Sequence, residues 1–184
     1  MYKRQGEDAP FIDAIKRQSA TAGGPLFLLI PRHPQRFDEA AALLEQAGVP
    51  YVRRSSGQDP GADTTVLLGD TLGEMAFYYA AADVAVVAGS FAPLGGQNLI
   101  EACAAGVPVI VGPHTFNFQQ AASDAIEAGA AQRQPDPAQA VAAALALVAD
   151  PPRRQAAGQA AQTWFASHSG ATARTMAALA PWLD

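Results

Sequence analysis

The chain has 184 residues, of which 49% are hydrophobic and 8% aromatic, so we expect one domain with a terminal appendage. Its 12 Lys and Arg against 17 Asp and Glu give a net charge of −5, which argues against sequence-independent binding to nucleic acid. A single cysteine, Cys103, excludes an internal disulfide and a cysteine-based zinc site. No apolar run approaches the roughly 18 residues of a membrane span, and the N-terminus lacks an apolar signal segment. We therefore expect a soluble, cytosolic chain.

The first basic loop follows a buried strand. Residues 1–5 are polar and aperiodic, typical of a leader or a cut end, and residues 10–18 predict a short amphipathic helix. A strand at 26–30 then ends in the basic loop 31–36. Because open α/β sheets bind ligands at the carboxyl ends of their strands, Arg32 is the first candidate for a phosphate contact. His33 lies beside it, and its plainer interpretation is a loop histidine bonded to backbone.

The middle of the chain alternates helix and strand. A helix is predicted at 37–47, closed by Gly48, and strands are predicted at 49–53 and 64–68. Residues 69–74 then turn into a helix that ends near residue 82. Thr71 and Glu74 have the spacing of a capping box, which favours a structural role for Glu74.

A glycine-rich loop at 89–101 is the strongest local signal. It follows a β-branched strand at 82–88, and Gly95 and Gly96 allow the backbone to pass close to a ligand. Asn98 is a natural N-cap for a helix that runs to about residue 105, and such a helix end favours an anion, typically a phosphate. Glu101 cannot bind phosphate, but its carboxylate can accept hydrogen bonds from the two hydroxyls of a ribose. A plain capping box formed by Asn98 and Glu101 is the alternative.

The last third of the chain is mostly helical. A strand at 107–111 leads into the loop 112–118, and Asn117 with Gln120 forms another capping pattern before a helix to about residue 128. A short strand at 130–133 is followed by helices at 138–149, 152–167 and 171–180. We expect three aromatic residues to anchor these helices to the body: Trp164, Phe165 and Trp182.

These elements predict an α/β fold, a Rossmann-like, doubly wound parallel sheet with helices on both faces. The expected organisation is a leader at 1–5, a nucleotide-sugar-binding domain at 6–150, and C-terminal helices at 151–184 that pack on it. No Gly-x-Gly-x-x-Gly is present, which argues against NAD.

The loops resemble, in order, the C-terminal half of bacterial Kdo transferases, the lipid A 3-deoxy-D-manno-octulosonic acid transferases. The resemblance covers roughly residues 6–133 and rests on the strings Pro31-Arg32-His33-Pro34-x-Arg36-Phe37, Gly69-Asp70-Thr71-x-Gly73-Glu74, Tyr79-Ala80-x-Ala82-Asp83-Val84, Gly89-Ser90-Phe91-x-Pro93-x-Gly95-Gly96-x-Asn98-x-x-Glu101 and Gly112-Pro113-His114-x-x-Asn117-Phe118.

The resemblance implies the C-terminal domain of a GT-B glycosyltransferase, which holds the donor CMP-Kdo. By position, Arg32 would meet the CMP phosphate, Leu72 and Gly73 would lie by the base, and Glu101 would hold the ribose. Ser90, Gly95, Gly96 and Asn98 would cradle phosphate or sugar. The donor-nucleotide set that we carry forward is Arg32, His33, Leu72, Gly73, Glu74, Gly89, Ser90, Gly95, Gly96, Gln97, Asn98 and Glu101.

The chain departs from the family pattern at several positions. Gln97 stands where the family commonly has histidine, and it cannot titrate near neutral pH. Ala102 stands where the family has proline. Of the turn that follows the family's first strand only Gly6 and Glu7 are present, so we expect the sheet to lack its first, central strand. By the same resemblance, we expect the acceptor-binding N-terminal domain, with its catalytic base and membrane anchor, to lie outside these residues, so no catalytic residue is expected here.

The implied function is that of the donor-binding half of an enzyme that transfers Kdo to a lipid A precursor in lipopolysaccharide biosynthesis. The parent would work at the cytoplasmic face of the bacterial inner membrane, with CMP-Kdo as substrate, no metal or other cofactor, and no nucleic acid partner. The fragment alone would be soluble and inactive. Two alternatives remain open: a nucleotide-binding module with no turnover, and another GT-B enzyme that uses a UDP-sugar.

Overall fold

The strands of the chain are short and all parallel. The computed structural model describes residues 7–18, 24–168 and 171–182, so the expected leader at 1–5 lies outside the described residues. Within these described residues the strands form two three-stranded sheets, one in the order β1-β3-β2 and one in the order β4-β5-β6. The strands are β1 (Phe27–Leu29), β2 (Tyr51–Arg53), β3 (Val66–Leu68), β4 (Ala85–Val87), β5 (Val109–Val111) and β6 (Ala131–Arg133).

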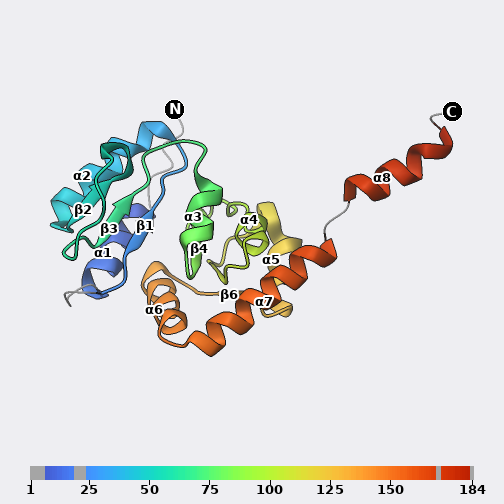
Figure 1. The fold of residues 1–184 in the computed structure, drawn as a ribbon. Coiled ribbons are helices and arrows are strands. Elements are labelled where there is room, and N and C mark those ends of the chain that lie inside the picture. The colour runs from blue at the N-terminus through green and yellow to red at the C-terminus, as the bar shows by residue number, and fades with distance from the viewer. Residues whose placement is uncertain (1–6, 19–23, 169–170, 183–184) are drawn as a thin grey trace.

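The α/β class with parallel strands and flanking helices is confirmed, but the single expected sheet is divided in two (Figure 1). Within the described residues, no strand pairs with β1 on the side away from β3, or with β4 on the side away from β5. The two sheets nevertheless share one apolar core, because Val86 of β4 packs against the same buried cluster as Phe27 and Leu29 of β1.

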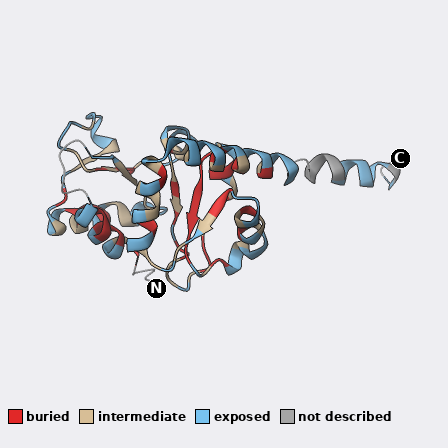
Figure 2. Cartoon of the chain, turned by 90° about the horizontal axis from the view of Figure 1, so that it is seen from below, coloured by how far each residue is buried: buried red, intermediate tan, exposed pale blue. Residues whose placement is uncertain are grey.

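The side chains of β5 alternate between the two faces of the second sheet, and both faces are covered. Successive side chains of a strand point to opposite faces. Val109 and Val111 belong to the core under the helices that carry Cys103 and Trp164. Ile110, between them, belongs to the core shared with the first sheet. All three are buried. Figure 2 shows that buried residues, in red, predominate on the central strands.

The helices fall close to their predicted positions. The α-helices are α1 (Asp8–Gln18), α2 (Phe37–Ala47), α3 (Met75–Ala81), α4 (Ile100–Ala104), α5 (Gln119–Glu127), α6 (Pro137–Val148), α7 (Pro151–His168) and α8 (Ala171–Leu179). The predicted closure of α2 is confirmed, since Gly48 has a left-handed φ of 66° and its N–H donates to carbonyls of the last turn. Helix α6 packs on α1 and on both β4 and β5, and so ties the two sheets together.

The C-terminal helices differ in how they attach. Helix α7 packs on α4 and α6, and Trp164 is buried there with Phe165 partly buried beside it, as expected. Helix α8 projects away from the body (Figure 1). Trp182 is 83% exposed, so the anchoring role predicted for it is wrong. None of the described helices combines the length and the apolar character that crossing a bilayer would require.

Candidate functional site

The predicted site residues lie in loops that follow parallel strands, at the carboxyl edge of the sheets. Residues 30–36 follow β1, 69–74 follow β3, 88–99 follow β4 and 112–118 follow β5. The first and third loops touch, because a guanidinium N–H of Arg32 donates to the side-chain oxygen of Gln97. Gln97 also packs over Gly89, where an added Cβ would lie 3.2 Å from Nε2 of Gln97. Arg32 and the glycine-rich loop are thus neighbours, 65 residues apart in sequence.

Close packing at Gly95 and a positive φ at both positions explain the glycine pair in this loop. Gly95 has a φ of 91°, and a Cβ there would lie 2.3 Å from Nδ2 of Asn117 and 2.6 Å from the Phe116 ring. Gly96, with a φ of 81°, donates its N–H to the Gly89 carbonyl at 2.7 Å. A larger residue at Gly95 would strain the backbone and displace the neighbouring loop, whereas at Gly96, where an added Cβ meets nothing closer than 3.5 Å, it would only strain the backbone. The Asn117 side chain donates to the Leu94 carbonyl at 3.2 Å and so holds the glycine-rich loop. It does not cap α5 as predicted, because the cap residue of that helix is Phe118.

Asn98 and Glu101 form a pair at the start of α4. Asn98 donates to the Glu101 carboxylate at 3.0 Å and accepts from the Ile100 N–H at 3.0 Å. The helix begins at Ile100 with Leu99 as the cap residue, one position after the predicted cap Asn98, although the Asn98 side chain does accept a first-turn N–H. The pair is not a reciprocal capping box, because the two side chains bond to one another. The Glu101 residue is exposed, and its carboxylate keeps unused acceptor capacity for hydroxyls.

The turn after β3 places its polar groups differently from the prediction. Helix α3 begins at Met75 with no side-chain cap, and Thr71 donates its hydroxyl to the Glu74 carboxylate instead of accepting from a backbone N–H, so the predicted capping box is wrong. Glu74 also pairs with Arg54 at 3.0 Å. The Thr71 hydrogen bond first, and the Arg54 pair second, lower the pKa of Glu74. Beside it, Leu72 is 68% exposed and Gly73 has a φ of 81°.

Three of the four arginines that the sequence places near this edge are ion-paired. Arg36 pairs with Asp8, Arg54 pairs with Glu74, and Arg53 pairs with both Asp38 and Asp70. Among the ion pairs of the described residues none involves Arg32, whose partner Gln97 is neutral. Arg32 is therefore the one of these four guanidiniums without a carboxylate partner among the described residues, and it lies beside the glycine-rich loop.

A buried cluster around Asp70 supports the turn after β3, and sequence reasoning missed it. Asp70 accepts from Arg53 Nε at 2.6 Å, from the Ser55 hydroxyl at 2.5 Å and from the Ser55 N–H at 2.8 Å. Burial raises the pKa of Asp70, but the hydrogen bonds from Ser55 and Arg53 outweigh it and hold the pKa below its ordinary value. No sequence signal joins these residues, because the contacts bridge 15 to 17 positions.

Ser90 is buried completely and its hydroxyl is used within the protein. It donates to the Val87 carbonyl at 2.7 Å and accepts from the Gly112 N–H at 2.7 Å. The preceding amide, of Gly89, donates to the carboxylate of Glu7. His33 is an exposed residue in the loop after β1, and its carbonyl accepts from the Arg36 N–H. Ligand contacts of Ser90, Gly89 and His33 stay predictions.

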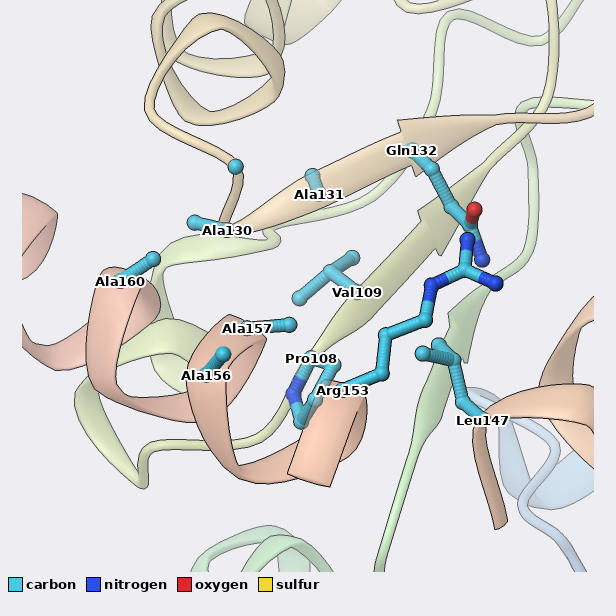
Figure 3. Close-up of a pocket in the computed structure, with 11 residues that line it drawn as sticks. Pro108, Val109, Ala130, Ala131, Gln132, Leu147, Arg153, Ala156, Ala157 and Ala160 are labelled. Carbon is cyan, nitrogen blue, oxygen red and sulfur yellow. The ribbon is translucent and has the colours of Figure 1, made fainter. Parts of the chain in front are cut away.

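A cavity of about 400 Å³ lies elsewhere, near the amino ends of β5 and β6 (Figure 3). Alanines of α7 line it, and Figure 3 shows Arg153 extending across it toward Gln132. Because it borders Pro108 and Gly129, before the two strands begin, it lies at the opposite edge of the sheet from the predicted site. It is therefore separate from the loops described above.

Known proteins resemble this chain over most of its length. Residues 53–164 match the family model described as glycosyl transferases group 1. A 3-deoxy-D-manno-octulosonic acid transferase of Bordetella pertussis is 66% identical over 184 residues, which is 98% of this chain and 43% of that protein. A transferase of the same name from Haemophilus influenzae is 34% identical over 97% of this chain and 42% of its own length.

A solved structure is similar to this chain in its fold as well as in its sequence. The crystal structure of the C-terminal CMP-Kdo binding domain of WaaA from Acinetobacter baumannii superposes with a TM-score of 0.83 and 32% sequence identity. The superposition covers 88% of this chain and 84% of that domain. By contrast, the chain spans less than half the length of the two full transferases.

Proposed function

Because the chain belongs to the group 1 glycosyl transferases, and among them to the Kdo transferases, we propose that it is the half of such an enzyme that binds the donor CMP-Kdo. The observation that carries the proposal is the contact between Arg32 and Gln97, which brings a cation without a carboxylate partner to the glycine-rich loop. A phosphate monoester or diester is the anion that such a guanidinium binds well.

The remaining groups suit the other parts of a nucleotide. The Glu101 carboxylate, oriented by Asn98, would accept hydrogen bonds from the two ribose hydroxyls. The exposed Leu72 side chain and the Gly73 backbone would border the base. On this arrangement Arg32 offsets the charge of the phosphate that departs with CMP, and a bound metal in this domain is unnecessary.

The activity of the complete enzyme follows from this assignment as part of the same proposal. We infer that the parent transfers Kdo to a lipid A precursor at the inner membrane, and that a carboxylate outside this chain deprotonates the acceptor hydroxyl. This chain alone would bind the donor without turnover, which fits its span of 43% of the Bordetella transferase.

Titration calorimetry of the 184-residue chain with CMP tests the donor assignment. We expect CMP to bind more tightly than UMP, and Arg32→Ala to weaken CMP about tenfold or more, because a charge-assisted contact to phosphate is lost. Arg153→Ala is the matched control, since it removes the same charge from an exposed residue at the opposite edge. Tighter binding of UMP than of CMP would favour a UDP-sugar enzyme instead, and equal affinities would contradict the expected preference for CMP.

The ribose contact has a separate test. Wild-type chain should bind CMP more tightly than 2′-deoxy-CMP, because Glu101 loses one hydroxyl partner with the deoxynucleotide. In Glu101→Ala this preference should disappear. An unchanged preference in the variant would show that Glu101 does not meet the ribose.

A further inference from the structure

One buried carboxylate joins the amino end of α1 to the glycine-rich loop. Glu7 is only 8% exposed, and it accepts from the N–H groups of Gly89 at 2.5 Å, Phe91 at 2.9 Å and Ala92 at 2.6 Å. Three backbone amides directed at one anion form the kind of concave site that binds phosphate in many proteins. In this chain the anion is a side chain of the protein itself.

Helix α1 holds this carboxylate in a fixed position. The Glu7 carbonyl accepts the N–H of Phe11 at 3.1 Å, so Glu7 stands at the first turn of the helix. The ring of Phe11 packs edge to face on Phe91, with ring centroids 5.1 Å apart. Ile12 and Ile15 are buried in the core where α1 packs on α2 and α6. The turn at residues 89–92 is therefore attached to α1 by a polar and an apolar contact.

The turn at residues 89–92 also sets the position of the candidate ligand groups. The Gly89 carbonyl accepts the Gly96 N–H at 2.7 Å, which links the turn to the glycine pair. Gln97 packs directly on Gly89 and bonds to Arg32. A shift of the turn would therefore move both the loop and the guanidinium beside it.

We propose that Glu7 is a positioning residue of the donor site, an inference that rests on the function proposed above. It fixes the turn at residues 89–92 before the nucleotide arrives. It also fills the amide site with a carboxylate, so the N–H groups of Gly89, Phe91 and Ala92 do not bind the donor phosphate. The phosphate is thereby directed to Arg32 and the second half of the loop.

Amide hydrogen exchange of the wild-type chain, followed by NMR with and without CMP, tests this directly. The amides of Gly89, Phe91 and Ala92 should be protected without nucleotide, as the Gly112 amide bonded to Ser90 should be, and CMP should change their protection little. Fast exchange without CMP and protection on its addition would mean that the nucleotide, and not Glu7, holds these amides, and would overturn the proposal.

Variants of Glu7 provide a second test of the positioning role. Glu7→Gln keeps the size of the side chain but replaces one acceptor oxygen with an NH₂ group, so at least one of the three amides loses its acceptor. We expect CMP affinity to fall about tenfold and that amide to lose protection while Gly112 keeps it. Glu7→Asp, shorter by one methylene, should restore the charge but not the affinity. Asp13→Asn, an exposed carboxylate on the same helix, is the matched control and should bind CMP like the wild type.

The outcomes separate this proposal from the donor assignment. Wild-type CMP affinity in a folded Glu7→Gln chain would refute the positioning role. If Glu7→Gln does not fold, amide exchange in the wild-type chain still decides whether Glu7 or the nucleotide binds the three amides. If the wild type binds no CMP but the three amides are protected, the donor assignment fails while the hold of Glu7 on the turn is supported.

Discussion

Arg53 offers an internal comparison, because it pairs with two carboxylates in opposite environments. Its Nε lies 2.6 Å from Asp70, whose side chain is 1% exposed, and its Nη2 lies 2.9 Å from Asp38, whose side chain is 90% exposed. The perturbations are Asp70→Asn and Asp38→Asn, which remove one charge each from the same guanidinium. We expect the first to destabilise the fold strongly and the second hardly at all.

The magnitude follows from the hydrogen bonds. Asp70 receives three donors, two on one oxygen and one on the other, and an asparagine has only one acceptor oxygen. Whichever way the amide turns, at least one donor loses its acceptor, and Arg53 loses its buried counter-charge. Hydrogen bonds to charged groups contribute about 1.5–3 kcal/mol, so Asp70→Asn should lower the free energy of unfolding by about 2–3 kcal/mol. Exposed pairs contribute at most about 1 kcal/mol, which bounds Asp38→Asn.

Urea unfolding at pH 7 measures both costs. Far-UV circular dichroism reports the whole chain, and the fluorescence of buried Trp164 reports the packing of α7. The free-energy loss in Asp70→Asn corresponds to a fall in Tm of about 5–10 °C for a domain of this size. Equal costs for the two variants would refute the argument that burial of the hydrogen-bonded carboxylate, and not the charge pair itself, sets the energy.

The pH dependence of stability tests the role of Asp70 independently. The pKa of Asp70 is lowered in the folded state, so its contribution is present above the unfolded pKa of about 3.9 and is lost as pH falls through the folded pKa. The stability difference between wild type and Asp70→Asn should therefore be constant from about pH 7 to 5 and shrink below about pH 4. A difference that persisted unchanged at pH 3 would contradict the lowered pKa.

Three further outcomes follow from close packing. Gly95→Ala should cost about 2 kcal/mol or more in urea unfolding, because it adds a clash with Asn117 to positive-φ strain, whereas Gly57→Ala, with open space around a φ of 69°, should cost about 1 kcal/mol. Gly112→Ala should be less tolerated still, since its Cβ would meet backbone atoms of Ser90 at 2.3 Å; wild-type stability would contradict this packing. Burial raises the pKa of Cys103 to about 11, so a disulfide reagent at pH 8 should react with it only after unfolding, and rapid modification of the native chain would refute its burial.

Local patterns predicted the order and type of the elements well. The β-branched runs became parallel strands, and Gly48 closes α2 with the expected left-handed conformation, because both signals act over a few neighbouring residues. The loops at the carboxyl ends of the strands were placed correctly for the same reason. The division into two sheets is a property of pairing between distant segments, which periodicity does not encode.

Capping patterns were the least reliable signal. The spacing of Thr71 and Glu74 and that of Asn98 and Glu101 satisfy a capping box, yet in both cases the two side chains bond to each other. Spacing alone cannot distinguish these arrangements, because the same three-residue separation permits both. Glu7 was recognised only as part of a resembling turn, since its partners lie 82 to 85 residues away.

The pairing of the arginines changes how the site can attract a nucleotide. A mouth with four free cations on an acidic body would steer anions over a distance. With Arg36, Arg53 and Arg54 each bonded to carboxylates, the local field is close to neutral, and the chain as a whole carries −5. Affinity for a phosphate must then come from short-range contacts with Arg32 and the loop. Such contacts depend on geometry within a few tenths of an ångström, so the residues that hold the loop matter as much as those that would touch the ligand.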